Sequence, residues 1–341
     1  MTLYRGGFAG SFGKMSDRIW PYLGSFLILA GLLRAETAKS GKEHWVVAAN
    51  QANQSIECYD QRDSDWSHPG AVRWAFTPQT PDYTPAEVMA ARLPSDARFR
   101  MTNHWDSTRV ILMVTSGGLA TIARFPDGKR LWSALVGGNP HAAELLPDGN
   151  IAVAASRGNW IRVYTSSQDS RSGHCVEFAL EDAHAALWDP MLERLWVMGR
   201  IPGGEDVITA LMIGGTPAKP SLTEDVARRH RLPSHGPHDL SPVYGDKNAL
   251  WLTTVDHGYR FDKRTGEFSK LPGASDGKDI KALSNAPDGP LVQAKKKPGG
   301  CYDWTTDTVL FHHPVSGELL MAREVRGACF YKARAWGDRY Q

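Results

Sequence analysis

The sequence has few cysteines and almost no net charge. The four cysteines, at positions 58, 175, 301 and 329, form no Cys-x-x-Cys pair. A zinc knuckle and a thioredoxin-like motif are therefore absent. Lys and Arg number 39 against 37 Asp and Glu, a formal net charge of +2, so the bulk charge does not indicate a nucleic-acid partner. Any electrostatic selectivity must be local.

The apolar run near the N-terminus is too short to cross a membrane. Residues 22–33 are almost entirely apolar, but a membrane-spanning helix needs about 20 such residues. Three basic residues precede the run, Arg5, Lys14 and Arg18, and two small residues after it offer cleavage points, Ala35 and Ala38. This pattern is typical of a secretory signal. We therefore predict a signal peptide over residues 1–38 and a secreted or periplasmic domain over residues 39–341, with an uncleaved anchor as the alternative.

Three segments of the chain repeat a small turn, a histidine and an apolar strand. They begin at residues 138, 181 and 234, and their histidines are His141, His184 and His238. The first two histidines are 43 residues apart and the last two are 54 apart. A four-stranded propeller blade has a period of about 40–50 residues. The repeat therefore predicts consecutive blades of a β-propeller.

The chain after the signal fits one all-β domain. Its 12 Trp, 33 Gly and 21 Pro suit many strands joined by tight turns. The strand pattern predicts a single propeller of six four-stranded blades, of which the first, from residue 44, lacks an inner strand. Residues 328–336 can supply that strand and close the ring. Rings of five or seven blades stay open as alternatives, because the loops at residues 77–95 and 221–234 can hide or mimic a strand pair.

The first strand of each propeller blade lines the central channel, so equivalent positions in the blades face a common axis. The third, fourth and fifth blades thus place His141, His184 and His238 at the channel. Basic residues and a tyrosine take the other positions: Arg98 or Arg100 in the second blade, Lys281 in the sixth, and Tyr331, Lys332 or Arg334 in the closing strand. His104 falls in the turn after its inner strand and is left out of this set.

The convergence of the three histidine side chains can be interpreted as a functional site or as a structural feature of the fold. Neutral histidines bind divalent metals and leave a position open for water or substrate. The predicted cofactor is accordingly a divalent metal ion, Mn, Zn or Ca, held by His141, His184 and His238. Metal-free acid/base chemistry or anion binding is the functional alternative. The structural alternative is that these histidines only hydrogen-bond to loop backbone at the channel mouth.

The cationic neighbours of the histidines indicate an acidic ligand, because Arg and Lys suit carboxylate and sulfate groups. The residues predicted to bind an acidic carbohydrate, or another small anion, are Arg100, Lys281, Lys332 and Arg334. The predicted function is an exported lyase or hydrolase, for example a β-eliminating enzyme whose catalytic residues are His141, His184, His238 and Tyr331. The alternative is a non-catalytic module that binds a glycan or a protein. We expect a monomer with no nucleic-acid partner and no membrane contact beyond the signal segment.

Two further features concern cysteine and tryptophan. Export permits disulfides, and Cys301 and Cys329 flank the predicted last blade, so a bridge between them is one interpretation and buried free thiols are the other. Trp304, and Trp160 in a predicted hairpin turn, are candidates for stacking on a ligand. The tryptophans within strands are interpreted as core.

Four segments of the sequence resemble an uncharacterised family of secreted bacterial propeller proteins, domain of unknown function 6528. They are residues 45–51, 136–149, 236–245 and 330–334. The resemblance covers nearly all the chain after the signal, and it implies a propeller and export but no activity. A looser comparison is with the propeller-fold oligogalacturonate lyases, which are similar in using channel histidines to hold a divalent metal. Blade number and ligand spacing differ, so no residue is carried over from them.

Overall fold

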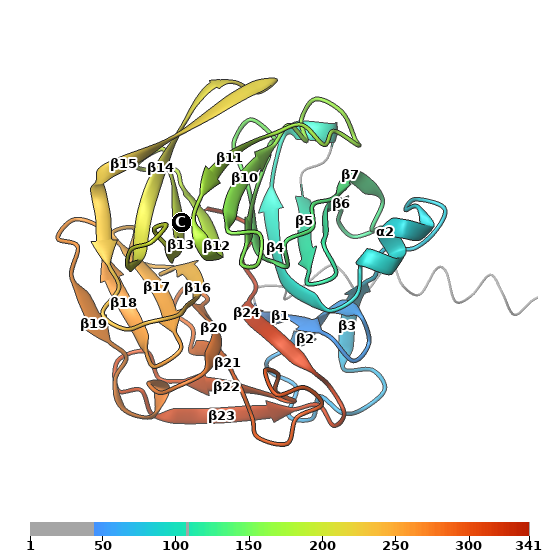
Figure 1. Cartoon of the computed structure of the whole chain (residues 1–341). Coiled ribbons are helices and arrows are strands. Elements are labelled where there is room, and N and C mark those ends of the chain that lie inside the picture. The colour runs from blue at the N-terminus through green and yellow to red at the C-terminus, as the bar shows by residue number, and fades with distance from the viewer. Residues whose placement is uncertain (1–43, 107–108, 341) are drawn as a thin grey trace, which may run out of the picture. The chain divides into compact units, whose positions relative to one another are not determined.

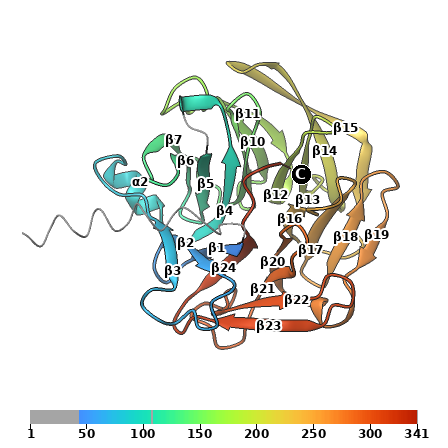
Figure 2. The same ribbon diagram turned by 180° about the vertical axis from the view of Figure 1, so that it is seen from behind.

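Six four-stranded antiparallel sheets are arranged as the blades of a β-propeller (Figures 1 and 2). The computed structural model describes residues 44–106 and 109–340. The predicted signal segment, residues 1–38, lies outside these described residues and stays a prediction. No helix in the described part of the chain is long and apolar enough to span a bilayer. The prediction of an all-β ring of six blades is confirmed.

The first three blades are built from consecutive strands, except for the strand that closes the ring. The first blade contains β24 (Phe330–Ala335), β1 (Trp45–Asn50), β2 (Ser55–Asp60) and β3 (Val72–Phe76). The second contains β4 (Pro94–Met101), β5 (Arg109–Thr115), β6 (Leu119–Arg124) and β7 (Arg130–Leu135). The third contains β8 (Pro140–Leu145), β9 (Ile151–Ala155), β10 (Trp160–Tyr164) and β11 (Cys175–Ala179).

The last three blades follow the same order from the inner to the outer strand. The fourth contains β12 (Glu181–Asp189), β13 (Arg194–Arg200), β14 (Asp206–Thr216) and β15 (Lys219–Arg231). The fifth contains β16 (Pro237–Pro242), β17 (Ala249–Thr254), β18 (Gly258–Asp262) and β19 (Phe268–Lys270). The sixth contains β20 (Ile280–Asn285), β21 (Leu291–Lys295), β22 (Thr308–His312) and β23 (Leu319–Glu324). Short helices occur at α2 (Pro85–Ala90), η3 (His104–Asp106) and η4 (Gly273–Ser275).

The apolar core lies between the blades, and the centre of the ring is polar. Each pair of adjacent blades encloses one cluster of buried apolar side chains, such as Trp132 and Trp160 between the second and third blades. Inner strands are buried on both faces, whereas outer strands such as β11 alternate between exposed and half-buried positions. Sheets that pack face to face bury apolar side chains in this way and leave polar residues outward. The core thus holds neighbouring blades together and leaves the inner edges free for polar groups.

The C-terminal strand closes the ring as the sequence predicts. β24 pairs antiparallel with β1, and the pairs run from Val46 with Ala335 to Asn50 with Phe330. Closure joins the last strand of the chain to the first blade and removes the unpaired edge that β1 would otherwise expose. His104 lies in η3, after the end of β4, and so belongs to a connection and not to an inner strand.

Beyond β24, the chain crosses the end of the channel where the inner strands terminate, and it finishes beside β12 and β13 (Figures 1 and 2). The Asp338 carbonyl accepts from the Met101 amide at 2.6 Å, the Arg339 carbonyl accepts from the Tyr244 hydroxyl at 2.9 Å, and the Tyr340 hydroxyl donates to the Leu145 carbonyl at 2.6 Å. These partners belong to the second, fifth and third blades. The tail therefore covers this end of the channel.

Trp336 anchors this tail, and its removal is expected to destabilise the ring. The indole lies 4.2 Å from the Phe99 ring and 5.6 Å from the Trp45 ring, measured between centroids, and the residue is 7% exposed. We expect Trp336→Ala to lower the free energy of unfolding by about 3–5 kcal/mol, because it leaves a cavity between the first two blades. Denaturant unfolding measures this. Val315→Ala, at a site 79% exposed, is the control and should change it by less than about 0.5 kcal/mol.

Candidate functional site

Every inner strand carries a β-bulge near its first residues. In β8, Pro140 pairs with Ala155 and Ala142 pairs with Ala154, so His141 is the extra residue. The equivalent extra residues in β4, β16 and β20 are Ser95, His238 and Lys281. The irregularity in β12 spans residues 182–184, and that in β24 includes Tyr331 and Lys332. Bulges re-aim side chains and are over-represented beside active sites.

In five of the six described inner strands, a residue with a left-handed backbone conformation (positive φ) lies near the bulge. It stands two positions before Ser95, His141, His184, His238 or Lys281. These residues are Leu93, Asn139, Asp182, Gly236 and Asp279, with φ of 56°, 57°, 50°, 70° and 61°. Asn, Asp and Gly adopt this conformation most readily. The small turn that the sequence repeats before each histidine is thus the turn that sets up the bulge.

The bulged residues lie at one end of the channel, and we call this set the mouth: Ser95, His141, His184, His238, Lys281 and Tyr331. Ser95 is fully buried and donates to the Val114 and Pro140 carbonyls, whereas the other five side chains lie beside one another. The centroid of the His184 ring lies 4.4 Å from that of His141 and 5.3 Å from that of His238. Tyr331 Oη lies 3.0 Å from His141 Nδ1, and Lys281 Nζ lies 3.0 Å from His238 Nε2. Each blade therefore contributes one residue to the mouth.

Hydrogen bonds orient the proton of Tyr331. Asn139 Nδ2 lies 3.0 Å from His141 Nε2 and 3.1 Å from Ser156 Oγ. An amide nitrogen donates, so His141 Nε2 accepts and the ring carries its proton on Nδ1. That proton is donated to Tyr331 Oη, which leaves the tyrosine hydroxyl able to donate to a ligand. Burial raises the pKa of Tyr331, so the hydroxyl stays protonated at neutral pH.

The other two histidines are also held by hydrogen bonds. His184 Nδ1 donates to the Asp182 carbonyl at 2.9 Å and lies 3.2 Å from the Asp182 carboxylate. His238 Nε2 accepts from the Lys281 ammonium, so its Nδ1 carries the proton, and this buried Nδ1 has no partner among the described residues. Burial, together with nearby positive groups, holds the pKa of His141 and His238 well below the ordinary value. Both rings are therefore neutral at pH 7.

Lys281 supplies a positive charge to the mouth and makes no direct carboxylate contact in the described chain, although the Asp279 charge acts on it from a greater distance. The residue is 8% exposed, and no Asp or Glu oxygen of the described chain lies within 4.0 Å of its ammonium. Burial lowers its pKa to about 8, so the side chain is mostly protonated at pH 7. A nearly buried ammonium without a direct ion pair is costly to the fold. The mouth is therefore predisposed to accept an anion.

Below the mouth, the remaining cations of the channel are paired with carboxylates. Asp239 accepts from Lys332 at 3.1 Å and from Arg334 at 2.5 and 2.7 Å, and Arg334 also donates to Asp96 at 3.0 Å. Burial alone would raise the pKa of Asp239, but Arg334 and Lys332 hold it below its ordinary value. In this network the basic residues Arg98, Arg100, Lys332 and Arg334 contact the acidic residues Asp96, Glu144 and Asp239. Inner strand β12 carries three more acidic residues, Glu181, Asp182 and Asp189.

The predicted site residues divide into those at the mouth and those below it. His141, His184, His238, Lys281 and Tyr331 lie together at the mouth. Lys332 lies just below, where its ammonium donates to the His141 carbonyl at 2.9 Å. Arg334 is bound by Asp239 and Asp96, and Arg100, near the end of β4, forms a two-bond pair with Glu144 at 2.5 and 2.7 Å. Three of the four cations that the sequence suggested for ligand binding are therefore paired with carboxylates, and Lys281 is not.

Sequence reasoning missed the three buried carboxylates, Asp96, Glu144 and Asp239. One signal was available in β4, where Asp96, Arg98 and Arg100 alternate with other residues and so share one face of the strand. Charged residues at alternate positions of a buried strand need partners of opposite sign. Nothing in the local sequence marks Glu144 or Asp239 as those partners.

The mouth does not form a ready-made metal site. Across residues 44–106 and 109–340, no group of three or more His, Cys, Asp or Glu side chains is arranged to hold a metal ion. Both ring nitrogens of His141 are hydrogen-bonded, and the Lys281 ammonium occupies His238 Nε2. Metal binding by the three histidines would require these contacts to be exchanged, and it stays a prediction.

Comparisons with known proteins identify a family and a fold. The profile of a family of unknown function, DUF6528, matches residues 33–338. Among solved structures, a protein of unknown function from Bacteroides caccae is similar, with a TM-score of 0.56, 12% identity, and coverage of 85% of this chain and 97% of that chain. At this identity the likeness shows the fold alone. No curated protein sequence matches.

Two further solved structures are similar at lower scores. Dihydro-heme d1 dehydrogenase NirN in complex with DHE has a TM-score of 0.46 and 13% identity, with coverage of 85% of this chain and 56% of that chain. A luciferin-regenerating enzyme has a TM-score of 0.47 and 13% identity, with coverage of 68% and 76%. These scores carry no argument about function.

The missing direct ion pair at Lys281 predicts opposite effects of two lysine substitutions. Lys281→Met should raise the free energy of unfolding at pH 7 by about 1–4 kcal/mol, because it removes a nearly buried charge that has no direct ion pair. Lys263 is a matched control, since it is 4% exposed and lies 2.6 Å from Asp189. Lys263→Met leaves a buried carboxylate without its partner and should cost about 3–5 kcal/mol. Denaturant unfolding at pH 7 measures both, and a destabilised Lys281→Met variant would contradict the assignment.

Proposed function

The chain belongs to the family of unknown function DUF6528, which supplies no reaction, and we propose from the site itself that the propeller binds an acidic saccharide at the mouth and cleaves it. The observation that carries this proposal is the Lys281 ammonium, nearly buried and without a carboxylate partner, beside neutral imidazoles and a tyrosine hydroxyl. An anionic group of a ligand would supply the missing counter-ion. A uronic acid presents such a carboxylate on a sugar ring.

The mouth offers the groups that a β-elimination needs. With the substrate carboxylate held by Lys281, His184 Nε2 takes the proton from the adjacent carbon. The electron pair forms a carbon–carbon double bond while the bond to the leaving glycosidic oxygen breaks. Tyr331 gives its hydroxyl proton to that oxygen, and the proton on His184 returns to the tyrosinate through solvent. The Lys281 charge stabilises the enolate-like charge that develops at the carboxylate.

Support for action outside the cytoplasm comes from two sources. Residues 1–38 have the pattern of a secretory signal, and Cys301 and Cys329 form a disulfide whose Cα atoms are 5.9 Å apart. Disulfides form and persist in oxidising compartments. We therefore place the reaction in the periplasm or the medium, where acidic polysaccharides are available.

The proposal predicts an unsaturated product from an acidic glycan. The purified protein should raise the ultraviolet absorbance of at least one of polygalacturonate, alginate, hyaluronan or chondroitin sulfate as the double bond forms. Tyr331→Phe should lower kcat by about 100-fold or more with little change in KM, because it removes the acid and not the anion site. Lys281→Met should raise KM.

The same assay separates catalysis from recognition. The nearly buried mouth, with His141 and His184 each 7% exposed, favours a second candidate, a module that holds an acidic group without cleaving the glycan. Saturable binding lost in Lys281→Met, with no new absorbance and no new reducing ends, would replace the lyase by this module. Absence of both binding and product would contradict both.

The metal-assisted form of the proposal has its own test. The adjacent rings of His141, His184 and His238 favour it, and a divalent metal would supply positive charge to the substrate carboxylate. Elemental analysis after supplementation with Mn, Zn and Ca should then find one ion per chain, lost when all three histidines are changed to Ala. Protein that retains no ion would leave Lys281 as the charge that binds the carboxylate.

A further inference from the structure

A pair of aromatic residues, half-buried Tyr302 and exposed Trp304, lies in the connection between β21 and β22. The Tyr302 and Trp304 rings are parallel, with 2° between their planes and 5.2 Å between their centroids. Trp304 is 43% exposed, whereas Trp160, the other tryptophan that the sequence suggested for stacking, is 4% exposed and belongs to the core. An exposed indole contributes little to the core, and exposed apolar patches commonly mark ligand sites.

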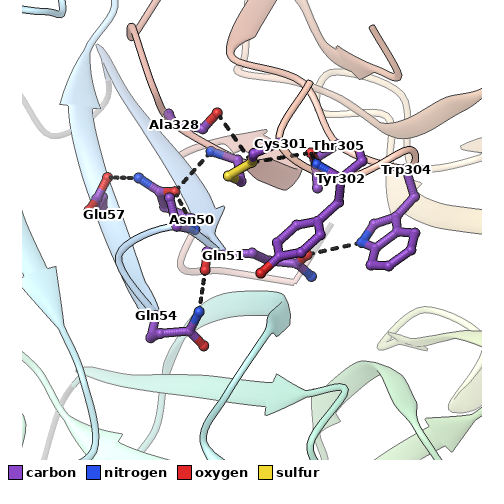
Figure 3. Close-up of a disulfide and its surroundings, with 11 residues drawn as sticks. Asn50, Gln51, Gln54, Glu57, Cys301, Tyr302, Trp304, Thr305 and Ala328 are labelled. Atoms are coloured by element: carbon purple, nitrogen blue, oxygen red, sulfur yellow. Dashed lines mark hydrogen bonds between the residues drawn. A yellow bond between two sulfur atoms is a disulfide. The ribbon is translucent and has the colours of Figure 1, made fainter. Parts of the chain in front are cut away.

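One side of the pair is hydrogen-bonded to Gln51, which follows β1 of the first blade and is itself bonded to neighbouring segments (Figure 3). Trp304 Nε1 donates to Gln51 Oε1 at 3.0 Å, and Gln51 is itself 1% exposed. The Gln51 side-chain amide donates to the Pro94 carbonyl at 3.2 Å, and its backbone amide donates to the Cys329 carbonyl at 2.9 Å. The Cys301–Cys329 disulfide ties the start of the aromatic segment to the same point. Rings fixed in advance lose little entropy when a ligand binds.

These anchors place the aromatic pair on the mouth side of the ring. Pro94 is the first residue of β4, directly before Ser95 of the mouth. Cys329 directly precedes β24, and Tyr331 of the mouth follows two residues later. The base of the connection is tied to the same end of the sixth blade, because the Lys296 amide donates to the carbonyl of Asp279, two residues before Lys281.

The connection that carries the aromatic pair has charges of both signs. Exposed Asp303 lies between the two aromatic residues, whereas Lys295 and Lys296, at the base of the connection, are half-buried. Burial lowers the pKa of Lys281, Asp279 raises it, and Lys296 lowers it further. The cations thus lie at the end of the connection that is next to the mouth, where they would attract an acidic saccharide.

We infer that Tyr302 and Trp304 form a stacking platform for a neighbouring sugar ring of the acidic saccharide whose carboxylate the mouth holds. The inference rests on the proposed function and extends it to a substrate of several units. The apolar C–H face of a pyranose packs on the exposed aromatic face. The disulfide and Gln51 act as positioning groups, since they touch the platform and not the sugar.

The test compares one acidic sugar unit with three. Binding of galacturonate, glucuronate and their trisaccharides is measured by fluorine NMR on protein labelled with 5-fluorotryptophan, in which Trp304→Phe assigns the Trp304 resonance. In the wild type the trisaccharide that binds should shift this resonance, and the monosaccharide should not. Trp304→Ala should weaken trisaccharide binding about tenfold and leave monosaccharide binding unchanged, while Trp304→Phe should retain most of it. The paired change of Cys301 and Cys329 to Ser should weaken only the trisaccharide.

The controls separate this inference from the proposed function. Val315→Ala, at an exposed apolar site in the β22–β23 turn, should leave both affinities unchanged. Lys281→Met should weaken monosaccharide and trisaccharide together. If Trp304→Ala binds the trisaccharide as the wild type does, the platform is overturned and the anion site stands. If no acidic saccharide binds, the proposed function fails, and binding of neutral cellotriose or maltotriose at the Trp304 resonance would then show a platform without an acidic substrate.

Discussion

The pairing of β24 with β1 is the constraint on which both the fold and the site depend. A propeller gains its stability from apolar layers between adjacent blades, and every blade has two neighbours only when the ring is closed. The strand that closes the ring also delivers Tyr331, Lys332 and Arg334 to the channel. Because Arg334 and Lys332 then bind Asp239 of the fifth blade, the same pairing neutralises a buried carboxylate. The strand pairing that closes the ring therefore also brings the residues of the site together.

Most charged side chains in the channel form ion pairs, and the Lys281 ammonium forms none among the described residues. Its lower part is a network in which Asp96, Glu144 and Asp239 each contact at least one arginine, so buried charge is compensated where no ligand enters. The tail beyond Trp336 covers that end. At the mouth, Lys281 has a neutral histidine as its neighbour and no direct carboxylate contact, and Asp279 acts on it only from a greater distance. A nearly buried ammonium without a direct ion pair, beside a channel whose other cations are paired, is the feature from which we argue for an anion site.

Much of the architecture follows from the sequence because its signals are local. The turn before each histidine needs a left-handed residue, and Asn139, Asp182 and Gly236 supply it. The repeat of this turn gave the blade period, and the missing inner strand of the first blade pointed to the C-terminal segment. The bulge was not predictable in this way. A regular strand sends His238 and Asp239 to opposite faces, but the extra residue in β16 shifts this alternation, and both side chains contribute to the channel.

The sequence by itself determined the strand pattern, the turn chemistry, the propeller class and the identity of the histidines that share a position in the repeat, and the structure settled the number of blades at six. The features that the sequence determined depend on neighbouring residues, whose preferences act within a few positions of the chain. Only the tertiary structure decided which charges are paired, because Arg334 and Asp239 lie 95 residues apart and meet only across the closed ring. It also decided that Lys281 has no such partner, and that Trp304 is exposed while Trp160 is buried. Burial and charge balance are properties of the assembled ring.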